Sequence, residues 1–206
     1  MDILIKETGH RNEKTLVIVK PDGVQRGLTG EVIRRFERVG LKMVALKFTV
    51  PNREMVQKHY TNDPEWFEKA GSKSIKSFMD KGIEPPTTNA VEMGHNILNK
   101  LVSFMTSGPV VVMVWQGAHA VSVVRKLTGG TEPLTSDVGT IRGDFVLDSY
   151  EMAEAQSRAV RNVVHASGTV DEAQIEIGQW FNSNEVIEYK AIHEQIMYQD
   201  FSDLMA

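Results

Sequence analysis

The sequence predicts an α+β fold with a ferredoxin-like, split βαβ order, in which an antiparallel sheet carries helices packed on one face. Two observations predict it. Short β-branched and apolar runs, typical of strands, alternate along the chain with segments whose apolar residues recur at helical spacing. The order of these segments is β-α-β, then a pair of helices, then β-α-β again.

The first βαβ unit is expected between residues 16 and 50. Residues 16–19 form a short β-branched run that ends in a turn at residues 20–23. Residues 30–40 place apolar side chains at helical spacing and finish with a glycine, which is typical of a helix end. Residues 43–50 alternate as a strand does and are stopped by Pro51.

The middle of the chain departs from this rhythm. Asn52 is placed to cap a short helix that reaches Tyr60. Residues 61–96 are rich in Pro, Gly, Ser and Thr, and we interpret them as an insertion that holds only a brief helix around Ile75. An apolar stripe over residues 97–105 predicts that a helix then resumes.

The second half contains the remaining strands. Residues 110–115 are apolar at every position, so we expect a strand that is buried on both faces. A helix over residues 118–127 leads into a connection at 128–147, and connections this long are usually functional or disordered. A charged helix is expected at 149–160 and a strand at 162–165.

The last predicted helix opens at Thr169, a residue suited to cap it. Its apolar residues Ile175, Ile177 and Trp180 are expected to face inward.

Composition excludes several classes of protein. The 206 residues have a net charge of −4, a hydrophobic fraction of 41% and no cysteine. A single domain with a real core is therefore expected, without disulfides, thiolate metal sites, Fe–S clusters or a cysteine nucleophile. The apolar patch at residues 3–5 is too short for a signal peptide and the run at 110–115 too short for a membrane span, so we expect a soluble, intracellular protein.

His165 is the first candidate for chemistry. It ends an apolar run and precedes a helix start, where catalytic groups and anions tend to meet. Imidazole is largely unprotonated at neutral pH and can act as a nucleophile or base. A packed or surface histidine is the alternative interpretation. No H-x-x-x-H or H-E-x-x-H spacing occurs, which argues against a histidine-built zinc site.

Three basic residues form the second candidate group. Lys20, Arg125 and Arg142 could each be a solvated charge, but Lys20 and Arg142 adjoin Gly and Asp, where backbone can approach a ligand closely. The arginine fork matches phosphate oxygens. Neither common glycine-rich phosphate loop is present, so any nucleotide would be bound through side chains.

Four segments together resemble the nucleoside diphosphate kinase family. They are EKTLVIVKPDGVQRGLTGEVIRRFE, SGPVVVMVWQG, GTIRGDF and RNVVHAS, and they occur in that family's order. The resemblance implies one domain over residues 1–206, with insertions at about 61–96 and 148–159. It also implies a cytoplasmic enzyme that passes the γ-phosphate of a nucleoside triphosphate to a nucleoside diphosphate by a ping-pong route through a phosphohistidine at His165.

The resemblance assigns roles to further residues. It places phosphate contacts at Lys20, Arg125, Thr131 and Arg142, a ribose and phosphate contact at Asn162, and an apolar contact at Leu101. Tyr60 would lie near the histidine, and Glu176 would accept a hydrogen bond from its ring. Mg²⁺ is expected to be held mainly through the nucleotide phosphates rather than by protein ligands. The loop with Pro133 implies a homo-oligomer, commonly a hexamer.

The chain departs from the family pattern in two places. After the histidine, Ala166 and Gly168 stand where the family has Gly and Asp, and neither change removes a catalytic group. The residue that stacks on the base is ambiguous, with Trp66, Phe67 and Ile97 as candidates. The family's few hydrogen bonds to the base imply low base specificity, and the two insertions could reshape either the nucleotide entrance or a subunit interface.

Two other functions remain as hypotheses beside an active kinase. A nucleotide-sensing module that has lost catalysis would have no need of the residues named above, all of which are present. Nucleic acid is not expected as the main partner, because the net charge is −4 and no basic stripe occurs.

Overall fold

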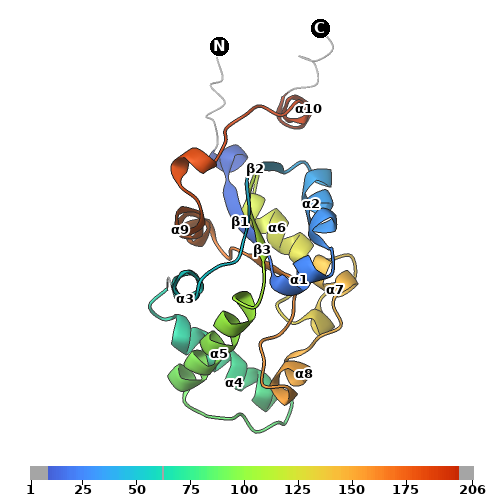
Figure 1. Ribbon diagram of the computed structural model, residues 1–206. Coiled ribbons are helices and arrows are strands. Elements are labelled where there is room, and N and C mark those ends of the chain that lie inside the picture. The colour runs from blue at the N-terminus through green and yellow to red at the C-terminus, as the bar shows by residue number, and fades with distance from the viewer. Residues whose placement is uncertain (1–8, 62, 200–206) are drawn as a thin grey trace.

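The computed structural model describes residues 9–61 and 63–199, which leaves the apolar patch at residues 3–5 outside the described part. Within these residues four strands form one sheet (Figure 1). They are β1 (Lys14–Val19), β2 (Lys42–Thr49), β3 (Val110–Gln116) and β4 (Val164–Ala166), in the order β2-β3-β1-β4. Every neighbouring pair is antiparallel, which confirms the predicted α+β class and split βαβ order.

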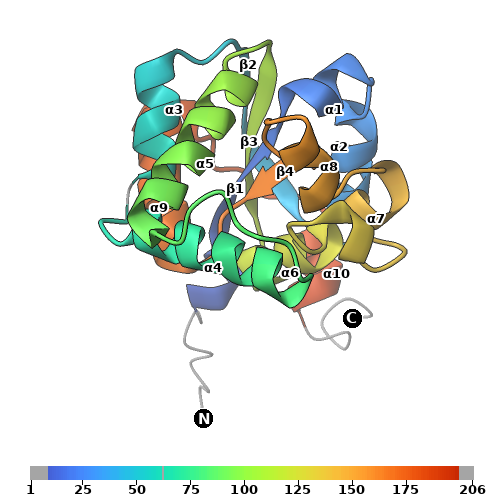
Figure 2. The same ribbon diagram turned by 90° about the horizontal axis from the view of Figure 1, so that it is seen from below.

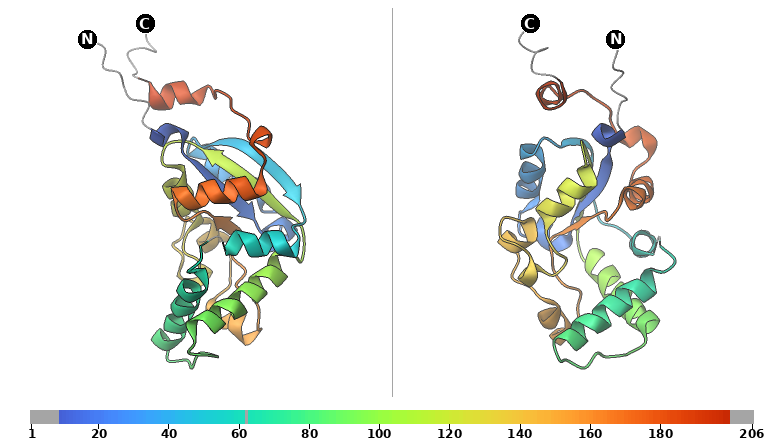
Figure 3. Two further views of the ribbon diagram at one scale, coloured as in Figure 1. Left: turned by 90° about the vertical axis from the view of Figure 1, so that its left-hand side faces the viewer. Right: turned by 180° about the vertical axis from the view of Figure 1, so that it is seen from behind.

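Helices cover both faces of this sheet, so the expectation of helices on one face is wrong (Figure 3). On one face, α2 (Thr29–Arg38) and α6 (Ala120–Thr128) pack against strand residues such as Trp115. On the other face lie α3 (Arg53–Tyr60), α5 (Ala90–Met105) and α9 (Val170–Trp180). Every residue of β3 is buried, as its unbroken apolar run predicted, and such a strand needs cover on both sides.

A long helix, α4 (Trp66–Asp80), occupies the stretch in which only a brief helix was expected. It packs against α5, which begins at Ala90 rather than near residue 97. A Cβ atom on Gly71 would overlap the carbonyl oxygen of Ala90, and one on Gly94 would overlap that of Phe67. The two helices therefore touch through their backbones, and glycine is needed at both contacts.

Shorter elements complete the described chain. They are the helices α1 (Pro21–Gln25), α7 (Ile141–Phe145), α8 (Tyr150–Ala155) and α10 (His193–Tyr198), and 3₁₀ turns at Gly9–Asn12, Pro133–Thr135 and Ser183–Glu185. α4, α5 and α8 gather at one end of the molecule and α10 lies at the opposite end (Figures 1 and 3). None of the helices in the described part of the chain is long and apolar enough to cross a membrane.

Two predicted helix caps are confirmed. The side chain of Asn52 accepts a hydrogen bond from Met55 N at 2.8 Å, and Thr169 accepts one from Glu172 N at 3.1 Å. The inner face predicted for α9 is partly wrong, because Ile175 is 50% exposed. The buried residues of this helix are Ala173, Glu176 and Trp180, so Trp180 faces inward as predicted, and the carboxylate of Glu176 is buried where Ile175 is not.

Candidate active site

A cavity of about 410 Å³ is lined by residues of β4, α4, α5 and α8, among others. The ribbon of β4 lies between those of α5 and α8 in Figure 2. Eight of the residues to which the resemblance gave a role in catalysis or nucleotide binding line the cavity: Lys20, Tyr60, Leu101, Arg125, Thr131, Arg142, Asn162 and His165. They come from the end of α3, from α5, α6, α7 and β4, and from the segments that follow β1 and α6 and precede β4. Segments that are far apart in the sequence thus converge at one end of the sheet.

Glu176 lies behind the cavity and contacts the histidine. Nε2 of His165 lies 2.8 Å from Oε1 of Glu176, which is 1% exposed. The hydroxyl of Ser167 donates to Oε2 of the same carboxylate at 2.6 Å, so both carboxylate oxygens are engaged. Among the described residues Nδ1 of His165 has no hydrogen-bond partner, and this nitrogen is left available to a ligand.

Burial sets the protonation of this pair. Burial, together with the charge of Lys20, lowers the pKa of His165 to about 3, so the imidazole is neutral at pH 7. Burial raises the pKa of Glu176 above its ordinary value. A neutral ring with one nitrogen hydrogen-bonded to a fixed carboxylate has a defined tautomer and orientation.

His59 is a neighbour that the sequence did not single out. Its ring centroid lies 4.4 Å from that of His165, and its Nδ1 lies 3.4 Å from Oε1 of Glu176. Nε1 of Trp180 donates to the same Nδ1 at 3.3 Å. His59, His165 and Glu176 are the one group of possible metal ligands found in the described residues. Two imidazoles and one carboxylate do not match the oxygen ligands that Mg²⁺ prefers.

Lys20 and Asn162 form the part of the cavity next to the histidine. Nζ of Lys20 donates to Oδ1 of Asn162 at 2.7 Å, and Nδ2 of Asn162 donates to the carbonyl oxygen of Thr131 at 2.9 Å. Burial and the neighbouring charge of Arg142 lower the pKa of Lys20 to about 7. This ammonium is therefore close to its titration point at neutral pH.

Arg142 is held by the backbone around it. Its guanidinium donates to the carbonyl oxygens of Asn162, Gly129, Gly130 and Val164 at distances of 2.5 to 3.3 Å. Burial lowers its pKa to about 10, so it keeps its charge at pH 7. The long connection around it, at residues 128–147, was expected to be functional or disordered, and it is ordered around this side chain.

A tight turn precedes the histidine where a strand was expected to start. Val163 has a φ of 64°, and Val164 N donates to the carbonyl oxygen of Asn162 at 2.6 Å. This backbone is strained for a β-branched residue. Two contacts with the start of α1 hold it: Lys20 N donates to the carbonyl oxygen of Val163 at 2.7 Å, and Asp22 Oδ2 accepts from Val163 N at 3.0 Å.

The structure also places the two residues that depart from the expected motif. Ala166 lines the cavity. Gly168 N donates to Oε2 of Glu172 at 2.8 Å, and a Cβ atom at position 168 would lie 2.6 Å from that oxygen. A carboxylate from one turn of α9 therefore stands beside the position at which an acidic side chain is missing.

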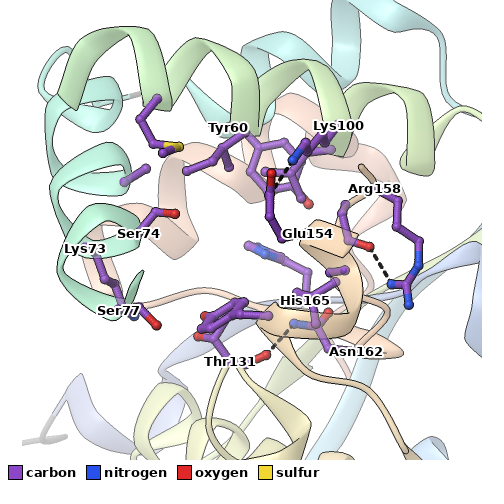
Figure 4. A pocket seen from close by; sticks show the side chains of 18 of the residues that line it. Tyr60, Lys73, Ser74, Ser77, Lys100, Thr131, Glu154, Arg158, Asn162 and His165 are labelled. Atoms are coloured by element: carbon purple, nitrogen blue, oxygen red, sulfur yellow. Dashed lines mark hydrogen bonds and ion pairs between the residues drawn. The ribbon is translucent and has the colours of Figure 1, made fainter. Parts of the chain in front are cut away.

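Two helices that lie in the predicted insertions form the outer wall of the cavity (Figure 4). α4 contributes Lys73, Ser74 and Ser77, and α8 contributes Glu154. Ion pairs fasten this wall: Lys100 to Glu154 at 2.7 Å and Lys81 to Glu132 at 3.1 Å. The two predicted insertions thus both reach the cavity. A repeat of Phe67, Gly71 and Ile75 at a spacing of four was the available signal for α4, and its central glycine weakened it.

Two of the three candidates for stacking on a base remain at the cavity. Trp66 and Ile97 line it. The ring of Phe67 instead stacks on His95 with centroids 4.2 Å apart.

Comparison with known proteins shows to which family the chain is related. The family model for nucleoside diphosphate kinase matches residues 13–84 and 87–186. A nucleoside diphosphate kinase of Pyrobaculum aerophilum is 48% identical over 180 residues, which cover 85% of this chain and 98% of that protein. The chain belongs to the nucleoside diphosphate kinase family.

Solved structures of the family agree with the fold. The crystal structure of an NDP kinase from Pyrobaculum aerophilum has a TM-score of 0.83 and 47% identity, and the match covers 86% of this chain and all of that one. A nucleoside diphosphate kinase from Borrelia burgdorferi, described as a transition-state mimic with bound vanadate and ADP, has a TM-score of 0.73 and 38% identity, covering 89% of this chain and 95% of that one. The ferredoxin-like arrangement predicted from the sequence is thereby confirmed.

Proposed function

We propose that this chain transfers the γ-phosphate of a nucleoside triphosphate to Nδ1 of His165, and from there to a nucleoside diphosphate. The observation that carries the proposal is the contact of 2.8 Å between Nε2 of His165 and Glu176, inside a cavity lined by Lys20, Arg125 and Arg142. In the first half-reaction a P–N bond forms as the bond from the γ-phosphorus to its bridging oxygen breaks. In the second half-reaction the terminal phosphate oxygen of the diphosphate bonds to the phosphorus as the P–N bond breaks, which returns His165 to its neutral form.

The charges around the histidine support this chemistry. A neutral imidazole held on one nitrogen presents the lone pair of the other nitrogen for attack. Phosphoryl transfer depends mainly on positioning and on neutralising the charge of the phosphate oxygens. Lys20, Arg125 and Arg142 would supply that positive charge, with Thr131 and Asn162 contributing polar contacts to the phosphates and ribose.

Mg²⁺ fits this site as a companion of the nucleotide. Lys20, Arg125 and Arg142 line the cavity together with the histidine and would position the phosphates, so the ion would be bound through the phosphate oxygens rather than by a protein cage. When bound, Mg²⁺ neutralises phosphate charge. The protein's own contribution is to hold the phosphates in line with Nδ1 of His165.

The proposal extends to assembly and to domain organisation. β2 is an edge strand, and its residues Leu46 and Phe48, with Val50 just after it, are more than half exposed. Such an apolar edge supports a homo-oligomer, and we take the hexamer as its form. A sedimentation experiment that found only monomers would contradict this. The packing of α4 and α8 around the same cavity supports a single domain that includes both insertions.

Labelling tests the proposed reaction. The protein is incubated with γ-labelled ATP and Mg²⁺, isolated, and then given GDP. The wild type should hold label in an acid-labile, base-stable form and pass it to GDP. His165→Ala should hold none and lose at least about 10⁴-fold in turnover, because the nucleophile is gone.

A matched control uses another histidine. His193 is exposed on α10, at the other end of the molecule, so His193→Ala should label and turn over as the wild type does. Full turnover in His165→Ala would overturn the proposal.

A further inference from the structure

Three hydrophilic side chains are among the α4 residues that line the cavity on its outer wall. Lys73, Ser74 and Ser77 lie within one turn and a half of the helix, and Figure 4 shows both serines projecting toward the cavity. Both serines are half-buried and Lys73 is exposed. A polar strip of three side chains therefore faces the space in which the nucleotide would lie.

The serine hydroxyls are free to bind a ligand. Serine and threonine in helices commonly donate to the carbonyl oxygen one turn back, as Thr106 does to Val102 at 2.8 Å. Neither Ser74 nor Ser77 makes such a bond, and within the described residues their hydroxyls have no hydrogen-bond partner at all. Lys73 likewise has no ion pair there, whereas Lys81, just after the same helix, is paired with Glu132.

The strip is held in a fixed position. α4 contacts α5 through the backbones at Gly71 and Gly94, where no larger residue fits without a shift. The ion pair between Lys81 and Glu132 fastens its other end to the loop beside Thr131. Polar groups on such a support can recognise a ligand with little loss of entropy.

The position of the nucleotide follows from the reaction. Its phosphates must lie at His165, and the apolar side chains Ile97 and Leu101 of α5 flank the cavity beyond. A flat base would lie with one face against these side chains, so its edge, which carries hydrogen-bond donors and acceptors, would point sideways along the surface of α5. α4 packs beside α5 and borders the cavity on that side with its polar strip.

We propose that Lys73, Ser74 and Ser77 hydrogen-bond the edge of the base and select bases with a carbonyl oxygen there, guanine and uracil, over adenine. A serine hydroxyl donates or accepts and so matches any edge, whereas the ammonium of Lys73 only donates and therefore sets the preference. The inference rests on the proposed function, which places the phosphates at His165. It departs from the low base specificity that the resemblance implied.

Kinetics of the second half-reaction test the selectivity. The wild type should use GDP with a kcat/KM about tenfold above that for ADP, the effect of one good hydrogen bond to a charged donor. Lys73→Met should bring this ratio close to one. Ser74→Ala with Ser77→Ala should lower kcat/KM for both nucleotides about tenfold with kcat unchanged, since a contact to the base acts equally in ground and transition states.

Lys76→Met is the matched control. Lys76 is exposed on the same helix but does not line the cavity, so its loss changes the charge of α4 equally and should leave the ratio at the wild-type value. A loss of selectivity in Lys76→Met equal to that in Lys73→Met would overturn the proposal.

Binding provides a measurement that is independent of the chemistry. In the His165→Ala background, calorimetry should give a Kd for GDP about tenfold below that for ADP, and Lys73→Met should remove the difference. Equal Kd values for GDP and ADP in His165→Ala, or a lower Kd for ADP, would overturn the inference about α4. A labelled phosphoenzyme in the wild type would still support the proposed function. Absence of the phosphoenzyme from the wild type would count against the proposed function itself, and the Kd ratio would still decide the role of α4.

Discussion

The floor of the cavity and its α4 wall are built in different ways. On the floor Lys20, Arg142 and Asn162 are nearly buried, and each is hydrogen-bonded to neighbouring protein groups. On the wall Ser74 and Ser77 are half-buried and their hydroxyls have no partner in the described residues. The geometry of the floor is therefore set by the fold, whereas the polar groups of the wall acquire their partners from the ligand.

Because of this difference, we expect floor residues to affect the rate of transfer and wall residues to affect the recognition of the nucleotide. A preorganised, buried network is suited to stabilise charge that develops during transfer, which affects kcat. Side chains on the wall contact parts of the nucleotide that do not react, so their loss should appear in KM and in selectivity. The following three substitutions or conditions test this division, in order of decreasing expected effect.

Glu176→Gln tests the floor behind the histidine. The substitution keeps the size of the side chain but removes the charge that orients His165, so kcat should fall by about 10²-fold while the KM for nucleotides changes little. Steady-state kinetics with ATP and GDP measure both values. Glu37→Gln, an exposed change of the same chemistry on α2, is the control. An unchanged kcat in Glu176→Gln would show that the carboxylate has no part in the reaction.

Gly71→Ala tests how the wall is supported. A methyl group at this position overlaps the carbonyl oxygen of Ala90, so α4 must move away from α5 and the free energy of unfolding should fall by about 2 kcal/mol. The KM for nucleotides should rise while kcat stays within a factor of about three. Denaturant unfolding and kinetics measure the two effects.

Gly178→Ala is the comparison for that substitution. Gly178 lies inside α9 with open space at its Cβ position, so alanine should leave stability unchanged or raise it by up to about 1 kcal/mol. Equal stability losses in the two variants would contradict the close contact between α4 and α5.

Lys20 gives the floor a pH dependence. Its pKa is lowered to about 7, so it loses its proton as the pH rises above neutrality and its attraction for phosphate goes with it. The kcat/KM for ATP should therefore fall about tenfold between pH 7 and about pH 8.5. Lys20→Arg keeps the charge and should flatten the profile, and a flat profile in the wild type would exclude this titration.

Much of the fold could be predicted because it depends on local pattern. The unbroken apolar run of β3, the alternation of β2 and the caps Asn52 and Thr169 each indicated an element correctly. α4 could not be predicted in the same way, because it packs on α5 through Gly71, a residue that reads as a helix breaker in the sequence. Only the unbroken apolar run of β3 indicated in the sequence that helices cover both faces of the sheet.

The residues of the site also differ in whether local sequence could predict them. Lys20, Arg142 and His165 stand next to recognisable sequence motifs, and the structure brings them together. His59 comes from another helix and has no motif of its own, so only the fold shows that it lies beside His165. The resemblance predicted that Glu176 contacts the histidine. The apolar pattern of α9 instead placed Ile175 on the inner face of the helix, because such a pattern cannot anticipate a buried carboxylate.

The strained turn at Val163 links the active site to the order in which the chain assembles. A conformation of this kind costs about 1–3 kcal/mol and persists only when its surroundings hold it. Here the holding groups are Lys20 and Asp22, which lie some 140 residues earlier in the chain. The histidine segment therefore takes its working shape only when these two distant parts of the chain are in contact. A nascent chain that has not yet made this contact carries an ordinary histidine, and the reactive geometry arises only from the tertiary fold.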